Sequence, residues 1–263
     1  MKWIVRVCVV VVAIYCGIKT MPVIYVSSGD NTSTTLHYVA LGDSIAYGYG
    51  LDNPDEESYV GKISRYLEGK YDYVLTANLG CNGQKSEELL DILKNPGNEN
   101  YRKYRASIQY ADIITLSIGS NDLLKLIELK LNIEEMIEKG DEKYQRACQQ
   151  FAVNFPEIIR AIHDINPNVE IYANNIYNPA KGIPFFANVY QVAEYYIDMI
   201  NKAFPQNDTY HLIDIKKAFD KQKKSMIKLA IKGTLSGGEI DPHPSREGHD
   251  LIAKMVIKEM ADA

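Results

Sequence analysis

The sequence predicts an α/β fold, a three-layer α/β/α sandwich in which helices cover both faces of a five-stranded parallel sheet. Five short apolar runs alternate with longer amphipathic runs between residue 36 and the end of the chain, and this alternation is typical of parallel strands joined by helices. Several of the short runs are apolar on both faces, as strands buried from both sides are. The 263 residues, 46% hydrophobic and 24% charged, are enough for one large domain and exclude a disordered or polytopic membrane protein.

The five strands are expected where short runs rich in Val, Ile, Leu and Tyr occur. In chain order these are residues 38–41, 73–77, 113–118, 169–173 and 211–213. Helices are expected where apolar residues recur at spacings of three and four. In chain order these are residues 58–68, 86–93, 122–138, 142–165, 186–203 and 246–260. The last helix has an apolar stripe that can pack on a sheet. The stripe consists of Leu251, Ile252, Met255, Val256 and Met260.

The amino-terminal residues have the pattern of an export signal. Two basic residues, Lys2 and Arg6, precede an apolar run from Val7 to Ile18, and small residues follow. This order is that of a signal peptide, while a longer apolar segment would make an uncleaved anchor, and a buried helix is a third alternative. We expect residues 1–28 to be a signal peptide or N-terminal membrane anchor, 29–35 a polar linker and 36–263 the folded domain. The protein is then exported, and is either secreted or associated with the outer face of the cell membrane through this segment.

Charge and cysteine spacing exclude two classes of partner. The chain has 29 Lys and Arg against 34 Asp and Glu, a net charge of −5, whereas nucleic-acid binding needs a basic face. The four cysteines lack the paired spacing of a metal site. We therefore expect no nucleic-acid partner, no metal and no cofactor.

The first candidate site residue is Ser44, in the motif Gly42-Asp43-Ser44 directly after the first expected strand. In parallel α/β folds, functional residues gather beyond the carboxyl ends of the strands. A glycine there allows the tight turn that exposes a nucleophilic serine. The same three residues are also a common turn and helix-cap sequence. The motif alone leaves a nucleophile and a structural cap as alternatives.

Two further strand ends carry candidate hydrogen-bond donors to an anion. Gly80 follows the second strand and offers a backbone N–H, and Asn121 follows the third strand in Gly119-Ser120-Asn121-Asp122 and offers a side-chain amide. The alternative for the second motif is a turn in which Asp122 caps the next helix.

A histidine with a neighbouring acid lies just before the last expected helix, in Asp241-Pro242-His243-Pro244. The prolines favour extended backbone at Asp241 and His243, and residues two apart on an extended chain point to the same side. The carboxylate can then hold the imidazole in the tautomer that accepts a proton from a serine hydroxyl. A serine, a histidine with its acid and two anion donors are thus all expected at one edge of the sheet.

Together the four motifs resemble the four conserved blocks of the SGNH hydrolases, also called GDSL lipases and esterases, and they occur in the family order. The resemblance extends from residue 38 to residue 260 and implies a flavodoxin-like α/β/α fold. It also implies Ser44 as nucleophile, His243 as general base and Asp241 as its orienting acid. The implied oxyanion hole consists of the N–H groups of Ser44 and Gly80 and the side chain of Asn121.

The spacing of acid and histidine departs from the family pattern. The family usually has two residues between them, whereas Pro242 alone separates Asp241 from His243, and Ile240 stands at the usual acid position. Asp241 remains the expected acid because a spacing of two aligns side chains on an extended chain. Glu239 and a backbone carbonyl are the alternatives.

These residues predict a serine hydrolase that cleaves carboxylic esters through an acyl-enzyme, acting on small-molecule or lipid esters as a lipase, acylhydrolase or lysophospholipase does. A carbohydrate O-acetylesterase, an acyltransferase and a noncatalytic binding module on the same fold stay open as alternatives. Aromatic residues at Tyr47 and Tyr49 and between residues 177 and 190 are expected either to form an apolar lip for an acyl chain or to pack in the core.

Overall fold

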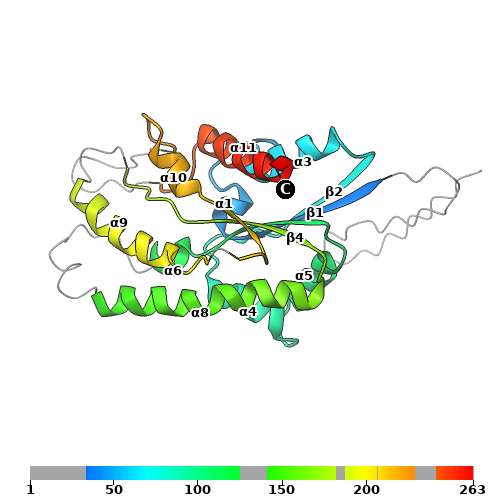
Figure 1. The fold of residues 1–263 in the computed structure, drawn as a ribbon, viewed down its shortest axis with the longest axis horizontal. Coiled ribbons are helices and arrows are strands. Elements are labelled where there is room, and N and C mark those ends of the chain that lie inside the picture. The colour runs from blue at the N-terminus through cyan, green and yellow to red at the C-terminus, as the bar shows by residue number, and fades with distance from the viewer. Residues whose placement is uncertain (1–33, 125–140, 182–186, 206, 229–240, 263) are drawn as a thin grey trace, which may run out of the picture. The chain divides into compact units, whose positions relative to one another are not determined.

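Five strands form a single sheet in which all neighbouring strands are parallel, as the sequence predicts (Figure 1). The structure is a computed structural model that describes residues 34–124, 141–181, 187–205, 207–228 and 241–262. The strands are β1 (Thr35–Gly42), β2 (Tyr73–Asn78), β3 (Ile113–Ser117), β4 (Glu170–Asn174) and β5 (His211–Ile213). Their order across the sheet is β2-β1-β3-β4-β5.

The strand order creates a topological switch point between β1 and β3. The chain moves outward from β1 to β2 and then returns to the other side of β1 with β3. The register pairs Gly42 with Ser117, so the last residues of the two strands lie side by side. Open α/β sheets bind ligands beyond the carboxyl ends of the strands at such a point, and this is where the first and third sequence motifs begin.

Helices cover both faces of the sheet, and each layer has its own hydrophobic core (Figure 1). The helices are α1 (Ser44–Tyr47), α2 (Pro54–Glu57), α3 (Tyr59–Glu68), α4 (Ser86–Lys94), α5 (Tyr101–Gln109), α6 (Ser120–Leu124), α8 (Asp141–Ile165), α9 (Ala187–Asn201), α10 (Ile215–Asp220) and α11 (Arg246–Asp262). Apolar residues of α4, α5, α8 and α9 pack on one face, and those of α1, α3, α10 and α11 pack on the other.

The strands supply alternate residues to the two cores because successive side chains point to opposite faces. In β1, Val39 and Leu41 belong to the core beneath α8, whereas Tyr38 and Ala40 belong to the core beneath α11. Burying a large apolar side chain stabilises the fold by about 1.5–3 kcal/mol. This double burial explains why the strand sequences are apolar on both faces.

The periodicity predicts five of the described helices to within one or two residues at their ends. These are α3, α4, α8, α9 and α11. The helix expected at 122–138 begins at Ser120 as α6, and its residues 125–138 lie outside the described part of the chain. The sequence did not predict α1, α2, α5 and α10. In α5 the buried residues are Tyr104 and Ile108, which are too few for an apolar stripe.

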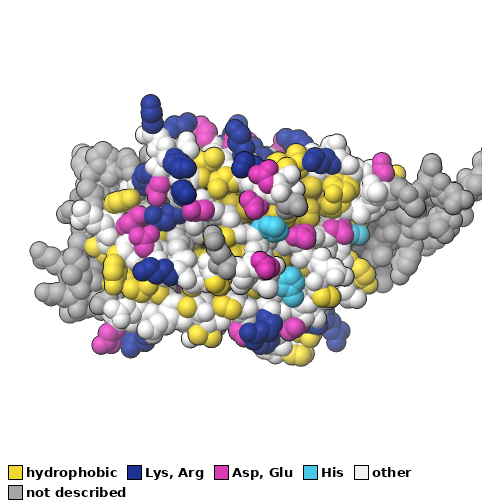
Figure 2. Space-filling view, viewed as in Figure 1, with side chains coloured by type: hydrophobic (Ala, Val, Ile, Leu, Met, Phe, Trp, Pro, Cys, Tyr) yellow, Lys and Arg dark blue, Asp and Glu magenta, His cyan; other side chains and the backbone are white. Residues whose placement is uncertain are grey.

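Charged side chains of both signs are interspersed on the face of the molecule that Figure 2 shows, with hydrophobic side chains between them. No helix within the described residues is both long enough and apolar enough to span a bilayer. The expected signal or anchor at residues 1–28 lies outside the described residues.

Candidate active site

Ser44 lies at the carboxyl end of β1, as the first residue of α1. The turn before it depends on Gly42, which has a φ of +126° and whose added Cβ would lie 1.9 Å from the carbonyl oxygen of Ser117. Asp43 is the N-cap of α1, and its Oδ1 accepts a hydrogen bond from the N–H of Ile45 at 2.9 Å. The motif is therefore a helix cap through Asp43, and it also positions the hydroxyl of Ser44 at the sheet edge.

The hydroxyl of Ser44 contacts the imidazole of His243, which lies 199 positions further along the chain. Ser44 Oγ is 2.8 Å from His243 Nε2, and His243 Nδ1 is 2.5 Å from Asp241 Oδ1. A carboxylate only accepts hydrogen bonds, so Asp241 keeps the imidazole proton on Nδ1 and leaves Nε2 to accept from the serine hydroxyl. The side chains of His243 and Asp241 are 19% and 20% exposed, so water has limited access to the pair.

The segment that carries Asp241 and His243 is held by backbone pairing. Asp241 Oδ1 accepts a second hydrogen bond, from the backbone N–H of His243 at 3.0 Å. The carbonyl oxygen of His243 accepts from the N–H of Lys228 at 2.8 Å, and Ile227 and Pro244 form an antiparallel bridge. A spacing of two residues thus brings the carboxylate to the imidazole, where the family uses a spacing of three.

Tyr177, in the segment after β4, holds the same turn through a side chain. Its hydroxyl donates to the carbonyl oxygen of Pro242 at 2.7 Å. Burial raises the pKa of Tyr177 well above its ordinary value, and the charges of Asp43 and Asp241 raise it further, so the hydroxyl keeps its proton and remains a donor. The sequence leaves Tyr177 open as a lip or core residue; the structure buries it, and nothing in the sequence indicates its contact with Pro242.

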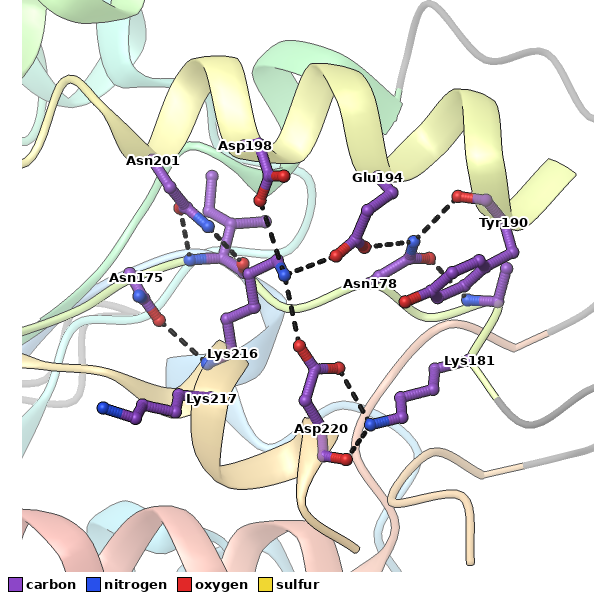
Figure 3. A network of polar contacts seen from close by, with 12 residues as sticks. Asn175, Asn178, Lys181, Tyr190, Glu194, Asp198, Asn201, Lys216, Lys217 and Asp220 are labelled. Atoms are coloured by element: carbon purple, nitrogen blue, oxygen red, sulfur yellow. Dashed lines mark hydrogen bonds and ion pairs between the residues drawn. The ribbon is translucent and has the colours of Figure 1, made fainter.

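A network of polar contacts ties the segment after β4 to α9 and α10 (Figure 3). The Nζ of Lys216 lies 2.5 Å from a carboxylate oxygen of Glu194, 3.1 Å from one of Asp220 and 3.4 Å from one of Asp198. Asn178 Nδ2 donates to the other oxygen of Glu194 at 2.8 Å. The segment is therefore fixed at several points.

Gly80, the first candidate oxyanion donor, lies against α1. An added Cβ would lie 2.4 Å from the backbone nitrogen of Tyr47, so a side chain at this position would collide with the helix that begins at Ser44. In this structure the N–H of Gly80 donates to Oδ1 of Asn78 at 3.0 Å. Asn78 in turn donates through Nδ2 to the carbonyl oxygen of Ala46 at 2.8 Å.

Asn121, the second candidate donor, lies in the first turn of α6, directly after β3. Its Nδ2 donates to the carbonyl oxygen of Gln84 at 3.1 Å, and a primary amide carries a second hydrogen for another acceptor. The neighbouring Asp122 does not cap α6 as the alternative interpretation expected. Its carboxylate instead accepts from the N–H and the hydroxyl of Ser86 at 3.1 and 2.5 Å, which fixes the start of α4.

Two buried titratable groups lie close to the site without touching the reacting atoms. Burial raises the pKa of Asp43 to about 7, and the nearby charge of Asp122 also raises it. Its Oδ2 has no hydrogen-bond partner among the described residues. His249 lies on α11, and burial lowers its pKa to about 3; its Nδ1 accepts from the N–H of Tyr59 at 3.2 Å. His249 is therefore a neutral core residue.

The structure brings Ser44, His243 and Asp241 into one hydrogen-bonded chain, and it places Gly80 against the helix that Ser44 begins. The alternative acid, Glu239, lies outside the described residues. Within the described residues, no group of three or more His, Cys, Asp or Glu side chains has the arrangement of a metal site.

An α/β/α sandwich with a Ser–His–Asp arrangement beyond the carboxyl ends of its strands has the architecture of a serine hydrolase. Residues 40–251 match the GDSL-like Lipase/Acylhydrolase family. The chain belongs to this family.

Two curated relatives align over most of the chain. The uncharacterised protein YpmR of Bacillus subtilis (strain 168) is 26% identical over 232 residues, covering 86% of this chain and 83% of YpmR. The spore germination lipase LipC of Bacillus licheniformis is 24% identical over 227 residues, covering 84% of this chain and 94% of LipC.

Solved structures share the fold. The lipase Lip_vut3 from a goat rumen metagenome superposes with a TM-score of 0.64 and 22% identity, covering 85% of this chain and 96% of the lipase. Phospholipase A1 from Streptomyces albidoflavus NA297 superposes with a TM-score of 0.62 and 15% identity, covering 84% of this chain and 98% of the phospholipase.

Proposed function

We propose that this chain hydrolyses carboxylic esters through an acyl-enzyme on Ser44. The observation that carries the proposal is the continuous contact from Ser44 Oγ to His243 Nε2 at 2.8 Å and from His243 Nδ1 to Asp241 Oδ1 at 2.5 Å. A serine hydroxyl becomes a useful nucleophile when an adjacent base accepts its proton and a third group orients that base. These three residues have the chemistry and the geometry for those roles.

In the first half of the reaction, Ser44 Oγ attacks the ester carbonyl carbon while His243 Nε2 accepts the hydroxyl proton. The carbonyl oxygen becomes an oxyanion, and Asp241 stabilises the imidazolium that has formed. When the tetrahedral intermediate collapses, the bond to the leaving alcohol breaks and His243 returns the proton to that alcohol. A water molecule then attacks the acyl-enzyme by the same steps, releasing the acid and restoring the Ser44 hydroxyl.

The proposed oxyanion hole consists of the N–H groups of Ser44 and Gly80 and the amide of Asn121. The N–H of Ser44 has no acceptor within the described residues, so it is available to an oxyanion. The Gly80 N–H donates to Asn78 Oδ1 at 3.0 Å, and we infer that an oxyanion shares or replaces this acceptor. Asn121 uses one amide hydrogen on Gln84, and among the described residues the other has no acceptor.

We propose small-molecule or lipid esters as the substrate class. LipC, Lip_vut3 and the Streptomyces phospholipase, which align over most of this chain, are named as a lipase, a lipase and a phospholipase. The side chains of Tyr47 and Tyr49 are each 46% exposed, so they are not core residues and offer apolar surface beside Ser44 to an acyl chain.

A panel of esters with graded acyl length and head group tests the proposed function, using the full-length chain, Ser44→Ala and the control Ser107→Ala on α5. We expect wild type and Ser107→Ala to hydrolyse esters and to react with a fluorophosphonate probe. Ser44→Ala should lose about 10⁴-fold or more in kcat and should not be labelled. Hydrolysis that survives in Ser44→Ala would contradict the assignment of the nucleophile.

The same panel separates the alternatives. A strong preference for acetyl esters of sugars would indicate an O-acetylesterase, and an acylated alcohol as main product would indicate an acyltransferase. A wild-type chain that neither turns over any ester nor reacts with the probe would indicate a binding module on this fold.

We also propose that residues 1–28 direct export, as a signal peptide or an anchor. The support is the order of Lys2, Arg6 and the apolar run from Val7 to Ile18. The mass of the protein recovered from the medium and from washed membranes tests it: cleaved protein in the medium indicates a signal peptide, full-length protein in membranes indicates an anchor, and full-length protein inside the cell would contradict export.

A further inference from the structure

We propose that Tyr49 is a positioning residue for His243, which holds the imidazole between Asp241 and Ser44 and stabilises it when it is protonated. The inference rests on the proposed function. The rings of Tyr49 and His243 have centroids 4.6 Å apart and planes tilted by 43°. No sequence motif indicates this contact.

The contact involves the imidazole ring itself rather than its nitrogens. Asp241 occupies Nδ1 and Ser44 occupies Nε2, and both act in the plane of the ring. A neighbouring aromatic ring at 4.6 Å therefore restricts rotation of the imidazole out of that plane. The side chain of His243 is only 19% exposed, and the ring of Tyr49 is one of the groups that contact it.

The backbone fixes Tyr49 in place on both sides. Gly48 and Gly50 flank it with φ values of +84° and +81°, which a residue with a side chain rarely adopts. The N–H of Tyr49 donates to the carbonyl oxygen of Ser44 at 2.9 Å. The ring is thus attached directly to the residue whose proton His243 is proposed to accept.

Lys228 joins the Tyr49 loop to the histidine segment. Its backbone N–H donates to the carbonyl oxygen of His243 at 2.8 Å, and its Nζ donates to the carbonyl oxygen of Gly50. Ser44, Tyr49, Gly50, Lys228 and His243 therefore form a closed ring of contacts. The position of Tyr49 against the imidazole is built into this ring and does not depend on packing in the core.

The chemistry of the contact follows from the charge that develops on His243. The histidine carries a positive charge from the attack of Ser44 until the leaving alcohol takes the proton. The face of an aromatic ring attracts a cation within about 6 Å of its centroid, and the centroids here are 4.6 Å apart. Phenylalanine would preserve this interaction, whereas leucine would preserve apolar bulk without the aromatic face.

The test compares Tyr49→Phe, Tyr49→Leu and Tyr49→Ala with wild type, Ser44→Ala and the control Tyr110→Ala, whose tyrosine is 65% exposed elsewhere on the surface. With p-nitrophenyl acetate, whose acyl group is minimal, we expect Tyr49→Phe and Tyr110→Ala to stay within about twofold of wild type. Tyr49→Leu and Tyr49→Ala should lower kcat by about five- to tenfold with little change in KM.

A second readout does not require catalysis. NMR of ¹³C-labelled histidine in the full-length chain, with His243 assigned by its loss in His243→Ala, measures the ratio of imidazolium to imidazole at a fixed pH. That ratio should be about two- to fivefold lower in Tyr49→Leu than in wild type and Tyr49→Phe. Among the described residues, the other charged or titratable groups around His243 are Asp241, Lys228, His249 and Tyr177, and they are the same in all the variants.

The outcomes separate the two claims. A leucine variant that matches phenylalanine in both kcat and the NMR ratio would overturn the role of Tyr49. Ester hydrolysis that persists in Ser44→Ala, or that is absent from wild type, would overturn the proposed function instead. The NMR ratio would then test the Tyr49 interaction by itself.

Discussion

The chain around Ser44 is fixed by close backbone contacts at two glycines, whereas the turn that carries His243 is fixed by backbone pairing together with two tyrosine side chains. On the serine side, added Cβ atoms at Gly42 and Gly80 would lie 1.9 and 2.4 Å from neighbouring backbone atoms. On the histidine side, backbone hydrogen bonds join His243 to Lys228 and Ser245 to Met226. The hydroxyl of Tyr177 and the ring of Tyr49 add side-chain contacts to this turn. From this difference we expect changes on the serine side to damage the fold and changes on the histidine side to alter catalysis in graded steps.

The largest effect is expected from a substitution on the serine side, Gly80→Ala. Gly80→Ala places a Cβ 2.4 Å from the nitrogen of Tyr47, so either α1 or the loop at Gly80 must move. We expect a loss of roughly 3–5 kcal/mol in the free energy of unfolding and about 100-fold or more in kcat. Denaturant unfolding and ester hydrolysis measure the two effects.

Gly97→Ala is the matched control, because its added Cβ meets only the side-chain oxygen of Asn95, at 3.2 Å. It should change the free energy of unfolding by less than about 1 kcal/mol. Equal effects at Gly80 and Gly97 would show that close backbone contact does not define the serine side.

The next prediction concerns the pH dependence of stability. Burial raises the pKa of Asp43 to about 7 from an ordinary value of 3.8. Between these values the unfolded chain loses the proton while the folded protein keeps it, so the stability that is fully present below pH 3.8 decreases as the pH rises towards 7. Asp43→Asn removes the titration and keeps the oxygen that caps Ile45.

The measurement is the difference in free energy of unfolding between wild type and Asp43→Asn from about pH 4 to about pH 7. As the pH rises through this range, wild type should lose about 1.4 kcal/mol of stability per pH unit relative to Asp43→Asn. The depressed pKa of His249, about 3, has the opposite effect on stability, which rises with pH up to the ordinary histidine value. It is common to both proteins and cancels in the difference. A difference that is constant with pH would show that Asp43 ionises normally in the folded protein.

The smallest predicted effect comes from a comparison of two buried tyrosines, one on each side of the site. Tyr177 and Tyr104 are both 5% exposed, and each donates a 2.7 Å hydrogen bond to a backbone carbonyl, of Pro242 and of Leu79 respectively. Each change to phenylalanine leaves a carbonyl without its partner and should cost about 1–3 kcal/mol of stability.

The two variants should differ in catalysis. Tyr177→Phe should lower kcat about tenfold, because it loosens the turn between Asp241 and His243. Tyr104→Phe should change kcat by less than about twofold, because close backbone packing still holds the loop at Gly80. Steady-state kinetics with KM determined separately distinguish the two, and equal losses of kcat would remove the distinction between the sides.

The sequence predicts the sheet and five of the described helices because their patterns are local. Apolar residues at every position of a short run, or at spacings of three and four, indicate which residues are buried. This pattern can be recognised without knowing the rest of the chain. The helix α5 has no such pattern, because it buries only Tyr104 and Ile108. The alternation of strands and helices then brings Gly42, Gly80 and Gly119, each at or just beyond a strand end, to one edge of the sheet.

The candidate site is predictable where a motif carries its own chemistry and not where a contact joins distant segments. Ser44, Asn121, Asp241 and His243 are each marked by neighbouring residues. Tyr177 and Tyr49 are not. One donates to a distant carbonyl and the other packs on a distant imidazole, and neither contact is indicated by the residues next to the tyrosine in the sequence.

By itself the sequence determined the strand order along the chain, the residue types available at the sheet edge and, through two prolines, the unusual spacing of acid and histidine. Only the tertiary structure decided that Ser44 and His243 meet at 2.8 Å across 199 positions, that Gly80 packs against α1, and that one tyrosine is buried while another lies on the imidazole. The physical reason is that local patterns fix backbone conformation and burial, whereas contacts between distant segments depend on the packing of the whole domain.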